Sequence, residues 1–299
     1  MLCRRRADCN LPGEGDLDLD YGLAIIFALF VWWFSTGAVL YVVGLPQRTF
    51  GVSMSVATLV AILAVAGLVV TSRDPSATGA YCAFTCGLLI WAWHEMSFLT
   101  GFLTGPRRVA CPPASTGWSR FGLAVQTLLY HEVAILVTAV LLAALTWGEP
   151  NQVGVWTFLL LWIMRLSAKL NVFLGVPNLA EEFLPDSLAF LKTYFAKQPL
   201  NLLFPASVTL ATIVTVLLVQ EASAGVSGYE VTGYTLLATL LGLAVIEHWL
   251  LVLPIPSAAL WGWGLKSRPP ALPAEDTGEQ ITSKIWVKQE TRVFRLSGR

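Results

Sequence analysis

Charged residues are scarce in this sequence. Only 13% of the 299 residues are Asp, Glu, Lys or Arg, whereas 56% are hydrophobic, and the mean hydropathy is +0.66. A soluble domain carries charge at about 25% of its positions. The 19 basic residues are balanced by 19 acidic ones, so the chain lacks the positive excess with which proteins bind nucleic acid. The composition therefore indicates an integral membrane protein and no nucleic-acid partner.

Cysteines and the motifs of common enzyme classes are also scarce. The five cysteines show no metal-ligand spacing; Cys82 and Cys86 are four residues apart, which suits small packing residues as well as a redox or metal pair. The sequence has no Walker motif, no His-Glu-x-x-His and no Glu-x-x-His spacing. Its last apolar run has no lysine to carry a retinal Schiff base. These absences argue against P-loop enzymes, zinc proteases, di-iron bundles and rhodopsins.

Long apolar runs are what the chain has in abundance. A helix needs about 20 such residues to cross a bilayer, and only helices satisfy their own backbone in lipid as single segments. The sequence therefore predicts an all-α, polytopic membrane helix bundle with about seven transmembrane helices. They are expected at 21–45, 52–71, 80–103, 121–146, 152–174, 202–220 and 231–253.

Polar segments flank this transmembrane domain, which we place at residues 21–263 with a leader at 1–20 and a tail at 264–299. The tail is expected to be flexible, with a short strand or helix at 281–294 as the alternative. The long loop 175–199 contains an amphipathic segment, because its leucines recur at helical spacing. That segment either docks against the bundle, lies on the membrane or presents a surface to a partner.

The loops alternate in positive charge. Lys and Arg gather in the loops after the first, third, fifth and seventh runs, and the loops around Glu149 and 221–230 have none. The positive-inside rule then places the amino terminus outside and the carboxyl terminus in the cytoplasm. The loop 175–199 is cytoplasmic in this orientation.

The polar residues inside the runs are the candidate site. The chain has only three histidines, each beside a glutamate: His94-Glu95, His131-Glu132 and Glu247-His248. Ionisable groups at membrane depth are costly and usually mark a function. Counting residues from the predicted cytoplasmic ends places the three pairs within about 6 Å of one depth.

Two cations accompany the three pairs. Arg165 and Lys169 lie in the fifth run, which has no acidic residue. We expect them to balance the charge of the glutamates in the other runs, because buried charges are tolerated when they are paired.

Three interpretations of the pairs remain open. They could be structural, with glutamates neutralising the cations and histidines hydrogen-bonding across the bundle. They could hold a pigment or haem through a neutral imidazole. They could form a metal-dependent enzyme, with a transition metal bound by His94, His131 and His248 and by neighbouring carboxylates.

Several motifs resemble a known family, the PuhE proteins, which are assigned to photosynthetic complex assembly in purple and related phototrophic bacteria. The resemblance covers about residues 20–268. The motifs are Trp93-His94-Glu95, Gly105-Pro106-Arg107-Arg108, Tyr130-His131-Glu132, Asn171-Val172-Phe173-Leu174-Gly175-Val176-Pro177-Asn178, Phe204-Pro205-Ala206-Ser207, Glu247-His248-Trp249, Leu253-Pro254-Ile255-Pro256 and Ala259-Leu260-Trp261.

The resemblance implies a multi-pass protein of the bacterial cytoplasmic (inner) membrane. It implies a role in building the reaction-centre/light-harvesting complex or in modulating bacteriochlorophyll supply. Its partners would be membrane lipid and either subunits of those complexes or other assembly factors. The resemblance assigns no cofactor, and bacteriochlorophyll, haem and a transition metal are the candidates that the histidines leave open. The resemblance brings no established catalytic residues. The alternative function is a membrane enzyme or tetrapyrrole-binding protein that uses the His/Glu site.

Overall fold

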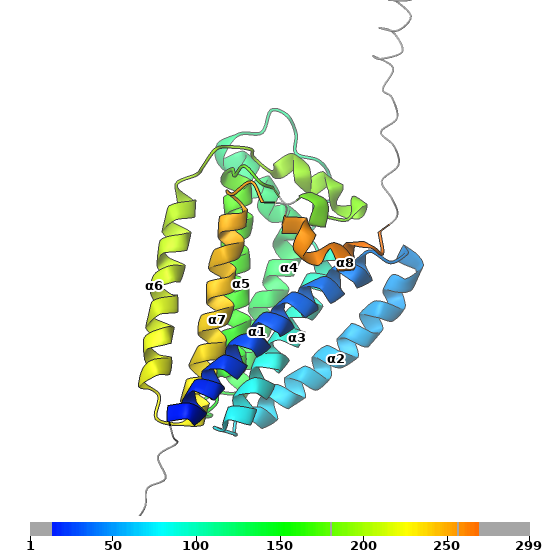
Figure 1. The fold of residues 1–299 in the computed structure, drawn as a ribbon. Coiled ribbons are helices and arrows are strands. Elements are labelled where there is room, and N and C mark those ends of the chain that lie inside the picture. Colours follow the sequence, from blue (N-terminus) through cyan, green and yellow to red (C-terminus); the bar gives the residue numbers. More distant parts are fainter. Residues whose placement is uncertain (1–13, 180, 256, 269–299) are drawn as a thin grey trace, which may run out of the picture. The chain divides into compact units, whose positions relative to one another are not determined.

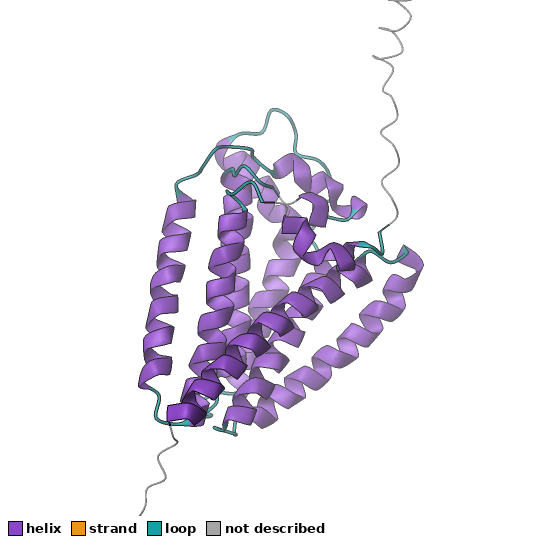
Figure 2. Ribbon diagram, viewed as in Figure 1, coloured by secondary structure: helices purple, strands orange, loops and turns teal. Residues whose placement is uncertain are grey.

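The computed structural model describes residues 14–179, 181–255 and 257–268. Within these ranges all regular structure is helical and no strand occurs (Figure 2). In the described part of the chain, seven helices are long and apolar enough to cross a membrane, which confirms the predicted all-α bundle. They are α1 (Glu14–Val43), α2 (Phe50–Thr71), α3 (Ala77–Leu99), α4 (Gly117–Leu145), α5 (Val153–Leu174), α6 (Leu203–Ala224) and α7 (Gly228–Leu250). The predicted element at 281–294 lies outside the described residues.

Polar caps set helix starts that the hydropathy pattern places differently. Helix α7 begins at Gly228 rather than at 231, because Ser227 and Glu230 form a capping box in front of the apolar run. Helix α3 begins at Ala77 rather than at 80, since the Ser76 hydroxyl accepts the Gly79 backbone N–H at 3.0 Å. A run of apolar residues therefore marks the part of a helix that can span a membrane, whereas the cap marks where the helix begins.

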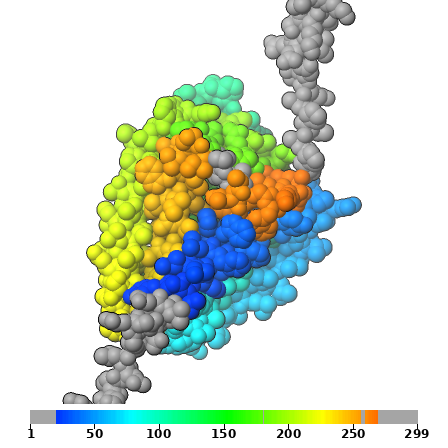
Figure 3. Space-filling model, in the orientation of Figure 1, coloured from blue at the N-terminus to red at the C-terminus, as the bar shows by residue number. Residues whose placement is uncertain are grey.

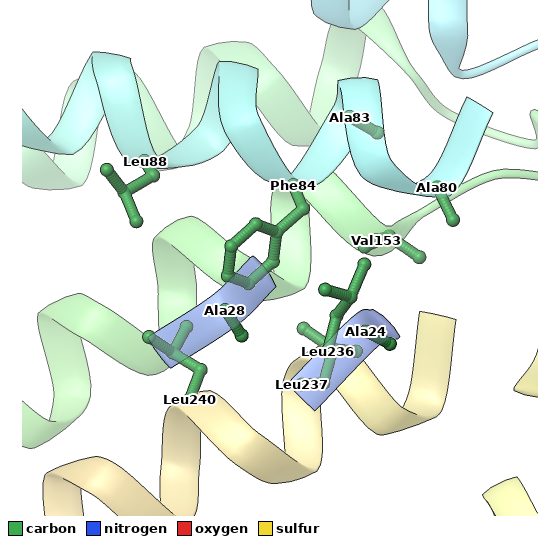
Figure 4. Packing of buried hydrophobic residues seen from close by; sticks show 10 residues of the cluster. All are labelled: Ala24, Ala28, Ala80, Ala83, Phe84, Leu88, Val153, Leu236, Leu237 and Leu240. Carbon is green, nitrogen blue, oxygen red and sulfur yellow. The ribbon is translucent and has the colours of Figure 1, made fainter. Parts of the chain in front are cut away.

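Helices α3 and α7 form the inside of the bundle. In their most apolar windows 61% and 56% of residues are buried, against 22% or less in the other five helices. Helices α2 and α6 lie at opposite edges, and α1 crosses between them (Figure 1). The inner contact contains small side chains, which let helices approach closely in a membrane. The buried residues of this cluster are Ala24, Ala28, Ala80, Ala83, Phe84, Leu88, Val153, Leu236, Leu237 and Leu240 (Figure 4).

Two glycines bring α3 and α5 into backbone contact. A Cβ atom on Gly154 would lie 2.6 Å from the carbonyl oxygen of Ala83, and one on Gly87 would collide with the carbonyl oxygen of Gly154. Any larger side chain at either position would push the helices apart. This close approach holds α5, which carries Arg165 and Lys169, directly against α3.

The loop 175–199 docks on the bundle. It contains the short 3₁₀ helices η2 (Glu181–Phe183) and η3 (Asp186–Tyr194). Leu188 and Leu191 of η3 are buried in a cluster with residues of α1, α2 and α3. Of the arrangements that the amphipathic pattern allowed, the structure therefore shows docking.

Tyr194 ties the end of η3 to the chain before and within α4. Its hydroxyl accepts a hydrogen bond from Arg107 Nε at 2.7 Å and donates one to the carbonyl of Val109 at 3.1 Å. Its backbone carbonyl accepts from an Arg120 guanidinium nitrogen at 2.6 Å. Three hydrogen bonds, to Arg107, Val109 and Arg120, thus hold one residue of the loop.

The chain after α7 returns to α1. It forms η4 (Ser257–Trp261) and the short helix α8 (Gly262–Leu265). The Trp33 indole donates to the carbonyl of Leu260 at 2.9 Å, and the Trp261 indole donates to the carbonyl of Trp33 at 3.1 Å. Figure 3 shows this segment in orange against the blue α1. It brings Trp261 to the same end of the bundle as the loop 175–199.

Candidate functional site

Helix α5 is the element that connects the polar residues of the bundle. Arg165, Ser167 and Lys169 lie within five consecutive residues, a rise of about 6 Å along the helix. Each of the three contacts a different helix, namely α3, α7 and α4. These three residues of α5 therefore contact the polar groups of its neighbours at one height along the helix, which we call the polar level.

Both cations pair with glutamates of the predicted set. A guanidinium nitrogen of Arg165 lies 3.1 Å from Glu95 Oε2, and Lys169 Nζ lies 2.8 Å from Glu132 Oε1. The other oxygen of Glu132 accepts from the Trp162 indole at 3.1 Å. The ammonium of Lys169 also lies 5.6 Å from the ring centre of Phe98, within reach of a cation–π interaction.

Glu247 stands apart from these pairs. Its Oε1 accepts a hydrogen bond from the Trp32 indole of α1 at 3.0 Å. Among the described residues no cation lies within 4 Å of its carboxylate. The polar level around α5 therefore has three glutamates and two cations.

His248 is hydrogen-bonded at both ring nitrogens. Nδ1 lies 2.8 Å from the carbonyl oxygen of Ala244, which only accepts, so Nδ1 carries the proton. Nε2 then accepts from the Ser167 hydroxyl at 2.9 Å. The Ser167 hydroxyl is also 3.0 Å from that of Ser207 in α6. This network joins α5, α6 and α7 and uses every hydrogen-bonding position of the imidazole.

His94 and His131 lie together on the other side of α5. Their ring centres are 6.3 Å apart, and both side chains are buried. His94 Nε2 lies 3.1 Å from the Thr138 hydroxyl, whereas the second nitrogen of His94 and both nitrogens of His131 have no hydrogen-bond partner among the described residues. The His131 ring packs 4.7 Å from that of Phe98.

The structure thus brings two of the three histidines together and leaves His248 in a separate network. No group of three or more His, Cys, Asp or Glu side chains that could hold a metal occurs in the described part of the chain. The imidazoles therefore do not share one centre in this geometry.

A cavity of about 370 Å³ lies beside the polar level. Its walls come from α1, α3, α4, α5 and α7, and they are mostly apolar. The loop 175–199 lines it through Phe183, Leu191 and Tyr194, and η4 lines it through Trp261. Pockets of about 300–1,000 Å³ with a few polar groups are typical ligand sites.

The charged groups on the cavity wall are Glu95, Arg165, Lys169 and Glu247. None of the three histidines lines the cavity, and neither does Glu132. Hydropathy and charge identified the four charged residues, but they gave no signal for Trp32, which is one of many tryptophans in apolar runs. Only the packing of α1 against α7 shows that Trp32 holds Glu247.

The fold and this site define the class: a polytopic membrane protein of seven helices with a ligand-sized cavity among its charged residues. The chain belongs to the family described as "Protein of unknown function (DUF3623)", which it matches over residues 19–271. It is 38% identical over 269 residues to the "Uncharacterized 30.4 kDa protein in puhA 5'region" of Rhodobacter capsulatus, covering 88% of this chain and 97% of that protein. No solved structure matches the chain.

Proposed function

We propose that this protein is an inner-membrane factor that assists assembly of the photosynthetic reaction-centre/light-harvesting complex or adjusts bacteriochlorophyll supply to it, as a PuhE protein would. The observation that carries the proposal is the name of the Rhodobacter capsulatus relative, which describes it as a protein in the 5' region of puhA. The motif resemblance found in the sequence leads to the same role. The partners would be membrane lipid and photosynthetic subunits or other assembly factors.

The cavity is the part of the molecule through which such a factor would handle a lipophilic component. It lies among helices that can span a membrane and its lining is mostly apolar, which suits a ligand of low solubility in water. The loop 175–199 covers it on one side, and Tyr194 anchors that cover. In the proposed orientation this side faces the cytoplasm, because the basic loops lie at that end.

A pigment or haem ligated by an imidazole is the second candidate, and the histidine geometry supports it less. Both nitrogens of His248 already make hydrogen bonds. His94 and His131 have free nitrogens, but both rings are buried away from the cavity. Since no histidine lines the cavity, a tetrapyrrole held in it would have no imidazole ligand, so the residues present do not fit an imidazole-bound tetrapyrrole there. A role in holding the helices together suits the histidines better.

The test is a deletion of the gene in a phototrophic host, complemented by the wild-type chain or by variants. We expect the deletion to lower the membrane absorbance of the assembled complexes, and we expect Glu247→Gln to restore it poorly. Glu221→Gln is the matched control, since Glu221 is exposed on α6 outside the cavity. Normal amounts of complex in the deletion strain would rule out the proposed role.

Analysis of the purified protein distinguishes the assembly factor from the imidazole-bound pigment or haem protein. The absorption spectrum and metal content of the purified protein should show neither a Soret or Q-type band nor stoichiometric iron or zinc. A tetrapyrrole band that disappears in His131→Gln would establish the second candidate instead.

A further inference from the structure

Charge is not balanced around the cavity. Lys169 forms an ion pair with Glu132, and Arg165 forms one with a single oxygen of Glu95. Arg165 also attracts Glu247 electrostatically, but its contact is with Glu95. The third carboxylate, that of Glu247, therefore has no ion pair within 4 Å among the described residues, and its hydrogen bond comes from the neutral indole N–H of Trp32.

An ionised carboxylate without a cation is costly at membrane depth, which is why buried charges there are almost always paired. Glu247 nevertheless lies on the cavity wall and not in a packed interior. One positive charge placed in the cavity would balance the three glutamates. No other charged side chain that lines the cavity is left to supply it.

The rest of the cavity wall suits an apolar body that carries a cation. Leucines and phenylalanines form nearly half of the lining, and Trp32, Trp91 and Trp261 contribute further aromatic rings. Aromatic faces attract alkylammonium groups more strongly when water is excluded. The lining of the cavity therefore combines apolar side chains, aromatic rings and the Glu247 carboxylate, which has no ion pair among the described residues.

We infer that the cavity binds an amphipathic ligand whose ammonium group lies against Glu247 and whose apolar part lies among the leucines and tryptophans. The ammonium group can belong to a free lipophilic amine or to the head group of a membrane lipid such as phosphatidylethanolamine. The inference concerns the ligand of the cavity and does not depend on the role in photosynthetic assembly.

The test uses the full-length protein in maltoside micelles, whose head groups carry no charge. Hexylammonium, hexanol and hexanoate share one apolar chain and differ in the head group. Binding is followed by tryptophan fluorescence, because three tryptophans line the cavity. We expect hexylammonium to bind at least about tenfold more tightly than hexanol, as expected for a paired charge in a desolvated site. Hexanoate should bind most weakly.

Glu247→Gln keeps the size of the side chain and the acceptor for Trp32 but removes the charge. It should abolish the preference for hexylammonium over hexanol, whereas Glu221→Gln should leave it intact. Phosphatidylethanolamine added to the micelles will compete with hexylammonium if the natural ligand is a lipid, and will not compete if it is a free amine.

Equal binding of hexylammonium and hexanoate to the wild-type protein would overturn the inference, and this measurement requires no variant to fold. An ammonium preference that persists in a folded Glu247→Gln protein would overturn it as well, since the cation would then bind elsewhere. Neither result would affect the deletion phenotype, so the inference and the proposed function fail separately.

Discussion

The ion pair between Lys169 and Glu132 should contribute strongly to stability. Lys169→Met keeps most of the apolar stem of the side chain and removes its charge. The two side chains are only 18% and 23% exposed, and the nitrogen–oxygen distance is 2.8 Å. The substitution therefore leaves Glu132 without a cation in a site that water reaches poorly.

Removal of one partner of a buried pair costs about 3–5 kcal/mol, because the other charge is left uncompensated. The Trp162 indole still donates to Glu132 in the variant, so we expect a loss of about 3 kcal/mol, near the lower end. Lys169→Met combined with Glu132→Gln removes both charges. The double variant should recover most of that loss, since two neutral side chains no longer pay for desolvation.

The assay is the free energy of unfolding of the purified protein, compared in a double-mutant cycle. Arg73→Met is the control, because Arg73 and Glu149 form a pair in the connecting loops with side chains 70% and 31% exposed. An exposed pair is worth at most about 1 kcal/mol. The reasoning is refuted if Lys169→Met destabilises no more than Arg73→Met, or if the double variant loses the sum of the two single losses.

Two further predictions concern topology and helix packing. A reporter enzyme fused after Arg268 should be active as a cytoplasmic fusion and one at Glu149 as a periplasmic fusion; the opposite pattern would reverse the proposed orientation. Gly87→Ala should lower the free energy of unfolding by about 1–3 kcal/mol, because the new methyl group meets the carbonyl of Gly154. Gly122→Ala on α4, where no atom lies within 4 Å of the added Cβ, should have little effect in the same thermal or chemical unfolding measurement.

Hydropathy and charge were enough to predict the seven helices. In a bilayer a helix must satisfy its own backbone, so a run of about 20 apolar residues has only one structure open to it. The same reasoning singled out the polar residues, because a charge at that depth is rare and must have a partner. Arg165 and Lys169 were therefore recognisable as the cations to be paired.

The pattern could not decide which partner each cation takes. The rotation of each helix about its axis determines that choice. Close backbone contacts, such as those at Gly87 and Gly154, constrain the rotation. The two ion pairs, to Glu95 and to Glu132, became known only from the structure.

The histidines also show that the sequence pattern does not determine which side chains lie together. The three His/Glu pairs share one level in the sequence-based topology, and that predicted a shared site. A common depth does not imply a common place, because helices at the same depth face different directions. The tertiary structure places His248 with Ser167 on one face of α5 and His94 with His131 on the other. It also leaves Glu247 without an ion pair among the described residues, because its carboxylate accepts a hydrogen bond from the Trp32 indole while Arg165 contacts Glu95.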